Sequence, residues 1–291
     1  METFLQILLR SLETGSIYAL MALAIIIIFR TSAFMHFAQG TMSLFNTYIM
    51  AFLLNHHGAP LWLAILGGVG GSIATAFLVD FVIIRRAKKV PHVSKQIITL
   101  GLILVFMGFI PVLFGVSLMT IPRIIPTGDL NVFGASISHN ALLNIGVGVA
   151  LMSILFLVLQ KTKLGLAVRT TAANEPIARL MGVPTRTITL FAWLAAGLLG
   201  LFAGVMIAPA GAVTATMMVP IQLNALFACV LGGFQTFHGP VIAAYLIAIS
   251  FNMTAFYVSS VWGLQIIYAL ILLFLVFRPH GLIGKRLVKK V

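Results

Sequence analysis

Residues 97–116 read IITLGLILVFMGFIPVLFGV and contain no charged side chain. A helix that crosses the hydrocarbon core of a bilayer needs about 20 consecutive, mainly apolar residues, and this stretch supplies them. It lacks the alternation of apolar and polar residues that marks the strands of membrane barrels. The stretch therefore predicts a membrane-spanning helix, and with it a helical membrane protein.

Similar apolar segments lie on both sides of this stretch. They cover residues 12–29, 34–54, 61–84, 141–159, 188–208, 218–233, 238–258 and 261–277. The segment 218–233 is short and ends in Gly232 and Gly233, which suits a broken or re-entrant helix. We predict an all-α, polytopic membrane protein with eight or nine transmembrane or re-entrant helices.

The composition agrees with this class. Of the 291 residues, 61% are hydrophobic and 8% are charged, whereas a soluble domain has about 25% charged residues. We expect residues 1–291 to form a single transmembrane domain, with no room for a soluble catalytic domain. The lone Cys229 rules out an intrachain disulfide and a Cys-based metal cluster. Residues 1–6 lack basic side chains, so the start does not resemble a cleaved signal.

The net charge of +13 would suggest a nucleic-acid partner in a soluble protein. In a membrane protein the placement of the basic residues carries the information. If all nine segments cross, Arg10 and Arg123 fall on one side and every other Lys and Arg falls on the opposite side. The positive-inside rule makes this crowded side cytoplasmic. We predict a multi-pass protein surrounded by membrane lipid, with its C-terminus in the cytoplasm and no nucleic-acid partner.

A basic loop at residues 161–187, KTKLGLAVRTTAANEPIARLMGVPTRT, is the longest polar interruption. Asn174 is a suitable N-cap for a short helix, and Glu175 favours the positive end of the helix dipole. Gly182 and Pro184 predict where the helix ends. Its small apolar face is expected to comprise Ala178, Leu180, Met181 and Val183. Such a helix outside the bilayer is predicted to contact a cytoplasmic partner.

Two apolar segments are interrupted by glycine and carry polar side chains. One is AFMHFAQGTMSLFNTY at residues 33–48, and the other is LGGFQTFHGP at residues 231–240. Helices broken around a solute path show this pattern, although polar residues also serve helix packing. The candidate path residues are His36, Phe37, Gln39, Gly40, Asn46, Gly232, Gly233, Gln235 and His238.

The remaining charged residues form no catalytic constellation. Asp80 is placed to pair with Arg85 or Arg86, and Arg10 with Glu13. No metal-binding HExxH motif and no phosphate-binding G-x-x-x-x-G-K-[ST] loop is present. We therefore expect no catalytic residue, metal or cofactor on this chain, and any ATP would bind to another chain.

Five blocks resemble, in order, those of the permease subunits of branched-chain amino acid ABC importers. The first is TGSIYALMALAIIIIFRTSAFMHFAQG, similar to the family's G-S-I-Y-A-L-x-A-L…N-F-A-H-G. The others are ITLGLILVFMG, KTKLGLAVRTTAANEPIARLMGV, VLGGFQTFHGPVIAAYL and LFLVFRPHGLIGKR. The resemblance covers nearly the whole chain, and five blocks in order are specific where one would be weak.

The resemblance implies a transmembrane permease domain in a bacterial-type inner membrane. Residues 161–187 would be the coupling loop that docks into a cytoplasmic ATPase. The implied coupling residues are Arg169, Ala172, Asn174, Glu175, Ala178, Leu180, Met181 and Gly182. Two ATPase subunits would hold ATP and Mg²⁺, a homologous permease would complete the pair, and a periplasmic or extracellular binding protein would deliver the solute.

The first block departs from the family pattern at three positions, one of which is Arg30, where the family usually has glycine. His36 stands where the family has Asn, and Gln39 stands where it has His. If this segment lines the path, the solute is in doubt, and urea, short amides or other amino acids are alternatives to branched-chain amino acids. A stand-alone secondary carrier or channel is the alternative to an importer subunit. It predicts transport without an ATPase.

Overall fold

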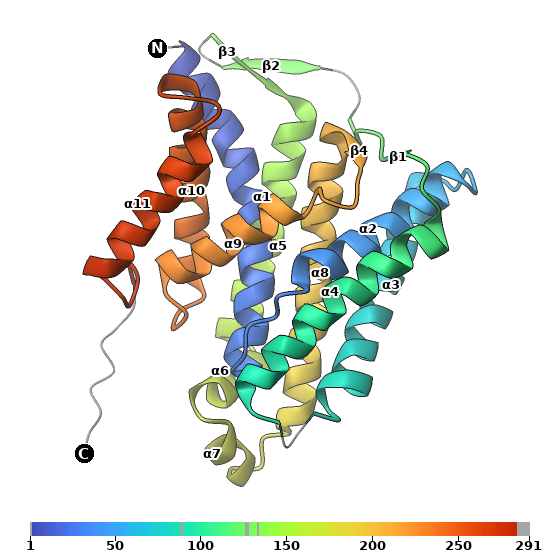
Figure 1. Ribbon diagram of the computed structural model, residues 1–291, viewed down its shortest axis with the longest axis vertical. Coiled ribbons are helices and arrows are strands. Elements are labelled where there is room, and N and C mark those ends of the chain that lie inside the picture. The colour runs from blue at the N-terminus through green and yellow to red at the C-terminus, as the bar shows by residue number, and fades with distance from the viewer. Residues whose placement is uncertain (1, 88–89, 126–127, 133, 284–291) are drawn as a thin grey trace.

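The computed structural model describes residues 2–87, 90–125, 128–132 and 134–283, and helices dominate it (Figure 1). Every apolar segment predicted above contains a helix. In chain order these helices are α1 Glu2–Ser32, α2 Gln39–Asn55, α3 Leu61–Leu78 with its π-helical extension η1 Val79–Ile84, α4 His92–Phe114, α5 His139–Lys161, α8 Thr185–Ile207, α9 Val219–Gly232, α10 His238–Tyr257 and α11 Gly263–Phe277.

Six stretches are long and apolar enough to cross a membrane. They are Glu2–Ser32, Leu61–Ile84, Val93–Phe114, His139–Lys161, Thr185–Ala210 and His238–Tyr257. Helices α2, α9 and α11 have 17, 14 and 15 residues and are shorter. The helical, polytopic membrane fold is therefore established, while the predicted count of eight or nine crossing or re-entrant helices is not confirmed.

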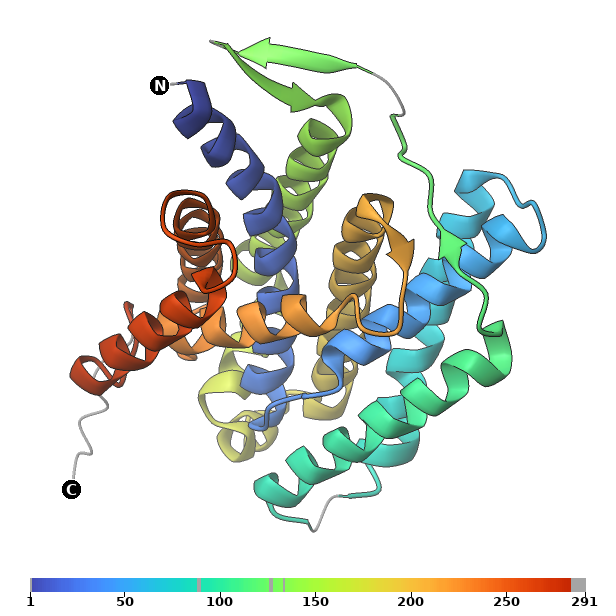
Figure 2. The same ribbon diagram turned by 45° about the horizontal axis from the view of Figure 1, so that its top comes forward.

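Helix α1 forms the centre of the molecule. Its run Ala19–Ile28 is completely buried, because α10, α8, α9 and α5 surround it. A helix that is apolar on every side has no face suited to water and belongs in a core. In Figures 1 and 2 α1 runs through the middle of the other helices, with its Glu2 end at the top of Figure 1.

Helix α2 packs on α8 through a buried polar strip. Ser43 and Thr47 point toward α8, where Gly200 and Gly204 leave room for them. A Cβ at Gly200 would overlap the Ser43 Oγ, so the close approach of the two helices requires glycine there. Small residues that let helix backbones approach are typical of membrane bundles. The small residues Gly197, Gly200 and Gly204 of α8 are thus part of a helix interface.

One end of the molecule contains short strands, which the all-α prediction did not include. Strand β1, Met119–Thr120, pairs antiparallel with β4, Ala212–Val213. Strands β2, Asp129–Val132, and β3, Ala135–Ser138, form a hairpin at the top of Figure 1. They arise because a connection of this length satisfies its backbone groups by local pairing.

The basic side chains gather at the opposite end. Arg85, Lys95 and Arg186 line one cleft there, and Arg30 and Arg169 line another. Arg10 and Arg123, by contrast, lie together near the strands. This separation follows the charge pattern predicted from the sequence. Six further basic residues of that prediction, Lys88, Lys89, Lys285, Arg286, Lys289 and Lys290, lie outside the described residues.

One of the two expected ion pairs forms. Arg85 Nε lies 2.8 Å from Asp80 Oδ2, which confirms the predicted pairing. The predicted pair of Arg10 with Glu13 is wrong, because Glu13 Oε1 instead accepts a hydrogen bond from Asn144 Nδ2 at 2.7 Å. The neutral Asn144 side chain on the neighbouring helix α5 lies within hydrogen-bonding distance of the partly buried Glu13 carboxylate, whereas the guanidinium of Arg10 is exposed.

We expect Gly200→Ala to destabilise the protein. The added Cβ must displace Ser43, and overpacking of this kind costs about 1–3 kcal/mol. Gly146→Ala on α5 is the matched control, since a Cβ there meets open space and gains about 1 kcal/mol of helix propensity. Thermal unfolding in detergent should show a lower Tm for Gly200→Ala alone, and equal Tm values would contradict the close packing of α2 on α8.

Candidate coupling surface and translocation path

Two short helices project from the end of the molecule opposite the strands. They are α6, Lys163–Ala173, and α7, Glu175–Leu180, at the bottom of Figure 1. Thr162 caps α6, because its Oγ1 accepts a hydrogen bond from Gly165 N at 3.1 Å. Asn174 caps α7, since its Oδ1 accepts from Ile177 N at 3.1 Å. The predicted N-cap of the short helix is confirmed.

The end of α7 is also as the sequence predicts. Gly182 has a φ of 81°, the left-handed conformation in which a helix commonly ends. The Gly182 and Val183 N–H groups donate to the carbonyls of Arg179 and Ala178. Glu175 in the first turn pairs with Arg179 in the last, one turn later. Charges of this order suit the helix dipole, so a helix of six residues is held at both ends.

The exposed apolar face of α7 differs from the predicted one. Leu180 is 88% exposed and Met181 is 74% exposed, and Ile177 joins them. Ala178 is only 2% exposed, because it faces the body of the protein, and Val183 is half-buried. Ile177 was missed by the sequence reasoning, although its spacing of three and four residues from Leu180 and Met181 places all three on one face.

The other predicted coupling residues lie around this face. Arg169 on α6 is exposed, and Ala172 is half-buried. The N-cap Asn174 and Glu175 are both exposed. The structure thus brings seven of the eight predicted residues to an accessible surface and turns Ala178 inward.

A polar cleft of about 250 Å³ lies at the base of α7. It contains both ion pairs, Glu175 with Arg179 and Asp80 with Arg85. Arg85 Nη2 also donates to the backbone carbonyl of Arg186 at 3.2 Å. One guanidinium therefore joins the end of η1 to the first turn of α8, immediately after the α7 loop.

The early polar segment divides into two environments. His36, Gln39 and Asn46 are fully buried between helices. His36 lies 4.6 Å from the ring of Trp193, and Gln39 Nε2 donates to Ala196 O at 2.9 Å, both on α8. Asn46 Oδ1 accepts a hydrogen bond from Thr75 Oγ1 on α3 at 3.0 Å. These contacts are helix packing, and a path-lining role for the three residues stays a prediction.

Phe37 and Gly40 face the other way, into a groove of about 320 Å³ between α2, α4 and α9. Gln222 of α9 holds this part of the chain, because its amide accepts from Gly40 N and donates to Phe37 O. Thr99 of α4 accepts from Phe37 N at 3.2 Å. Sequence reasoning missed Gln222 and Thr99. Gln222 had a signal, since it is a polar residue inside the apolar segment 218–233.

The late interrupted segment is a tight turn between α9 and α10. The backbones of Gly232 and Gly239 touch, and a side chain on either would collide with the other. Gly233 ends α9. Gln235 and His238 line an open cleft with Arg30 and Arg169 at the base of α6. The two interrupted segments therefore line different hollows.

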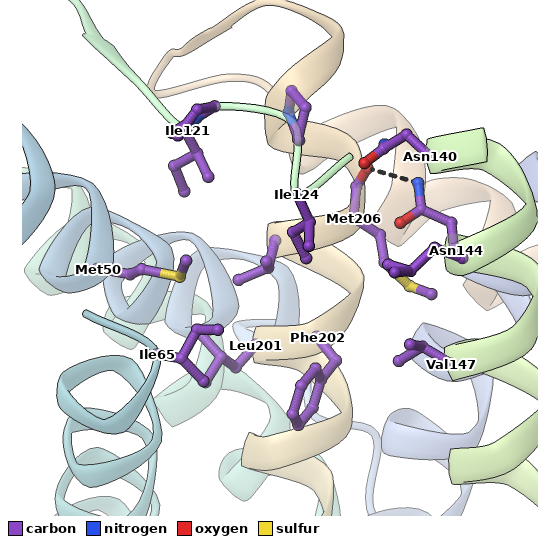
Figure 3. A pocket seen from close by; sticks show the side chains of 14 residues that line it. Met50, Ile65, Ile121, Ile124, Asn140, Asn144, Val147, Leu201, Phe202 and Met206 are labelled. Carbon is purple, nitrogen blue, oxygen red and sulfur yellow. Dashed lines mark hydrogen bonds between the residues drawn. The ribbon is translucent and has the colours of Figure 1, made fainter. Parts of the chain in front are cut away.

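A fourth hollow, a cavity of about 240 Å³, lies toward the strands (Figure 3). Ile121 and Ile124 of the connecting segment pass over it, and Leu201 and Phe202 of α8 lie beneath. Asn144 stands at its rim and donates to Met206 O at 3.3 Å. Apart from this rim the lining is almost wholly apolar. The structure thus has an apolar pocket at one end and a protruding helix at the other.

Among the residues that the structure describes, no three His, Cys, Asp or Glu side chains gather closely enough to hold a metal ion. Cys229 is fully buried, where its Sγ lies 3.4 Å from the carbonyl of Ala22.

Comparison with known proteins identifies relatives over nearly the full length. Residues 7–276 match the family model "Branched-chain amino acid transport system / permease component". The high-affinity branched-chain amino acid transport system permease protein LivH of Escherichia coli K12 is 24% identical over 99% of this chain and 98% of its own length. The probable branched-chain amino acid transport permease protein LivH of Methanocaldococcus jannaschii is 25% identical, over 94% of this chain and 91% of its own.

A further relative is the permease protein BraD of a high-affinity branched-chain amino acid transport system in Pseudomonas aeruginosa. It is 22% identical over 99% of this chain and 98% of its own length. No solved structure matches the chain.

We expect Arg85→Met to destabilise the protein strongly. Asp80 is 1% exposed, and removing one partner of a buried pair costs about 3–5 kcal/mol. Arg86→Met is the matched control, because Arg86 is exposed. The double change Asp80→Asn with Arg85→Met should recover most of the loss, since no buried charge remains. Equal Tm values for the Arg85 and Arg86 variants would rule out a stabilising role for the pair.

Proposed function

The chain belongs to the family of permease components of branched-chain amino acid transport systems, and from this membership we propose that it is the membrane-spanning permease subunit of an ATP-driven ABC importer. It would form part of the translocation path and switch between states open to either side. Its role is transport and not catalysis. The family match over residues 7–276, together with the capped and exposed α7, carries the proposal.

We propose that α7 couples this chain to an ATPase. Ile177, Leu180 and Met181 form an apolar face that is too exposed to contribute to the protein's own core. A short helix with such a face suits a hydrophobic groove on a partner. Two cytoplasmic ATPase subunits would hold ATP and Mg²⁺, and closure of their dimer would push on α7.

The distribution of basic residues supports a proposed orientation in the membrane. The end that bears α6 and α7 also carries Arg30, Arg85 and Lys95, and the positive-inside rule supports a cytoplasmic position for it. We propose that the C-terminus lies on this side of a bacterial-type inner membrane. The strands near Arg10 and Arg123 would then face the periplasm or the outside, where a solute-binding protein docks.

The groove between α2, α4 and α9 is the proposed part of the path. Its lining is apolar apart from Thr41 and Gln222, and Phe37 and Gly40 of the broken segment border it. Irregular backbone at membrane depth is tolerated where it lines a cavity. A second, homologous permease subunit would close this open groove from the other side.

Branched-chain amino acids are the proposed solutes. The names of the relatives support them, as do the apolar hollows. His36 and Gln39 depart from the family pattern but are buried against α8, so their substitution need not alter the groove. Urea, short amides and other amino acids are the alternatives that a solute panel would separate.

We expect Leu180→Ser with Met181→Ser to abolish most ATP-driven leucine uptake. The complex should be reconstituted in liposomes with its ATPases, partner permease and binding protein. Both side chains are exposed, so their loss removes apolar contact with the partner without opening the core. Leu272→Ser, an exposed leucine on α11, should transport like the wild type.

Two outcomes would overturn this assignment. Wild-type uptake by the Leu180 and Met181 variant would remove α7 as the coupling element. Leucine uptake by this chain alone, in liposomes without ATP, would favour a secondary carrier or channel.

A bulky residue in the groove should block transport. Leu223 lines the groove and Leu246 on α10 does not, although the two are 43% and 45% exposed. Leu223→Trp is expected to reduce leucine uptake at least roughly fivefold, about 1 kcal/mol of obstruction, while Leu246→Trp keeps it. Equal uptake by the two variants would place the path elsewhere.

A further inference from the structure

Two hollows adjoin at the end of the protein that carries the strands. One is the apolar cavity of Figure 3, and the other is a polar cleft of about 320 Å³. They share Asn140, Met206 and Pro209 as walls. The combined space is apolar at one end and charged at the other.

The polar cleft at this end of the molecule, near the strands, holds charges of both signs. Arg10 and Arg123 line it, and within the described residues neither guanidinium forms an ion pair. Glu13 lines it too, one helical turn from Arg10 on α1. Asn144, which lines the apolar cavity, donates to the Glu13 carboxylate at 2.7 Å and fixes it near the boundary of the two hollows.

Asn140 stands on that boundary with unused hydrogen-bonding capacity. Its side chain is 7% exposed, and its Oδ1 accepts no hydrogen bond from the described part of the chain. A buried acceptor without a donor costs free energy, and a ligand that brings an N–H group would satisfy it. The carbonyl and the Glu13 carboxylate both suit an ammonium group.

We propose that the joined hollows bind the solute itself, as an outer reception site for a zwitterionic amino acid with a branched apolar side chain. The carboxylate lies against Arg10 and Arg123, and the ammonium lies near Glu13 and Asn140. The side chain enters the apolar cavity between Ile124 and Phe202. This inference rests on the proposed function for the class of solute.

The charges favour this ligand over an anionic lipid. A phosphate headgroup is matched by cations alone, and Glu13 would repel it. A free amino acid presents one charge of each sign on one carbon, next to its apolar side chain. The Ile121–Ile124 segment also covers the apolar cavity on the side of the strands, which suits a small enclosed ligand.

The test measures binding of radiolabelled L-leucine to the full chain in neutral phosphatidylcholine nanodiscs, without a binding protein. Two analogues report on the charges: 4-methylpentanoate lacks the ammonium, and leucinol lacks the carboxylate. Glu13→Gln keeps the hydrogen bond from Asn144 and removes the charge. It should weaken leucine and leucinol roughly tenfold, as expected for one charged hydrogen bond, and leave 4-methylpentanoate unchanged.

The double change Arg10→Gln with Arg123→Gln should show the opposite pattern. It should weaken leucine and 4-methylpentanoate roughly tenfold or more and leave leucinol unchanged. Arg86→Gln, an exposed arginine at the other end of the molecule, is the charge control. Equal effects of either change on all three ligands, or no effect on any, would overturn the site.

A second pair of variants tests the apolar end. Val147 lines the cavity, and Val149 on the same helix is exposed outside it. Val147→Phe should abolish leucine binding by filling the cavity, and Val149→Phe should not. Leucine binding that survives Val147→Phe, or bound phospholipid found in the purified chain and displaced by that change, would assign the cavity to another occupant.

Failure of this site and failure of the proposed function give different results. If the reconstituted complex takes up leucine with ATP, the importer function is supported. If the Glu13 and Arg10–Arg123 variants then bind and take up leucine like the wild type, the reception site is wrong. If no amino acid is taken up with ATP, the function falls first, and the site falls with it.

Discussion

The amide of Gln222 holds together a break on which the rest of the bundle depends. Between α1 and α2 the chain leaves helical geometry, and its backbone groups lose their regular partners. No water in a bilayer core would replace them. Gln222 from α9 accepts from Gly40 and donates to Phe37, and Thr99 from α4 accepts from Phe37. The short helix α9 is thereby tied to α2, and the groove between them has a fixed floor.

Much of the fold follows from the sequence because a bilayer imposes simple rules. Helix positions follow from apolar runs, and the burial of Leu20 and its neighbours on α1 follows from a helix that is apolar on every side. The hydrogen-bonding partner of a polar side chain cannot be predicted from the sequence in the same way. Glu13 turned to Asn144 and away from Arg10, since a contact across helices depends on packing angles that no local spacing encodes.

In the candidate sites, too, features that depend on near neighbours in the chain were predictable from the sequence, and features that depend on packing between helices were not. The caps of α7 depend on neighbours three residues apart, so Asn174 and Gly182 were predictable. Which face of α7 points outward depends on how α6 and α8 hold it, and Ala178 faces inward for that reason. Likewise, no sequence pattern separates the buried Gln39 from the groove-lining Gly40, although they are adjacent in the chain.

Helix α8, Thr185–Ile207, runs as one helix between the two ends of the molecule. Its first turn follows α7 and is tied to η1 through Arg85, and its later residues Leu201 and Phe202 form the floor of the far cavity. The 23 residues of α8 span roughly 35 Å at 1.5 Å per residue. If α8 moves as a straight unit, a tilt of about 5° about one end displaces the other end by roughly 3 Å. Such a tilt of α8 would by itself change the shape of the far cavity, and no transfer of protons or charge between the two ends would be needed.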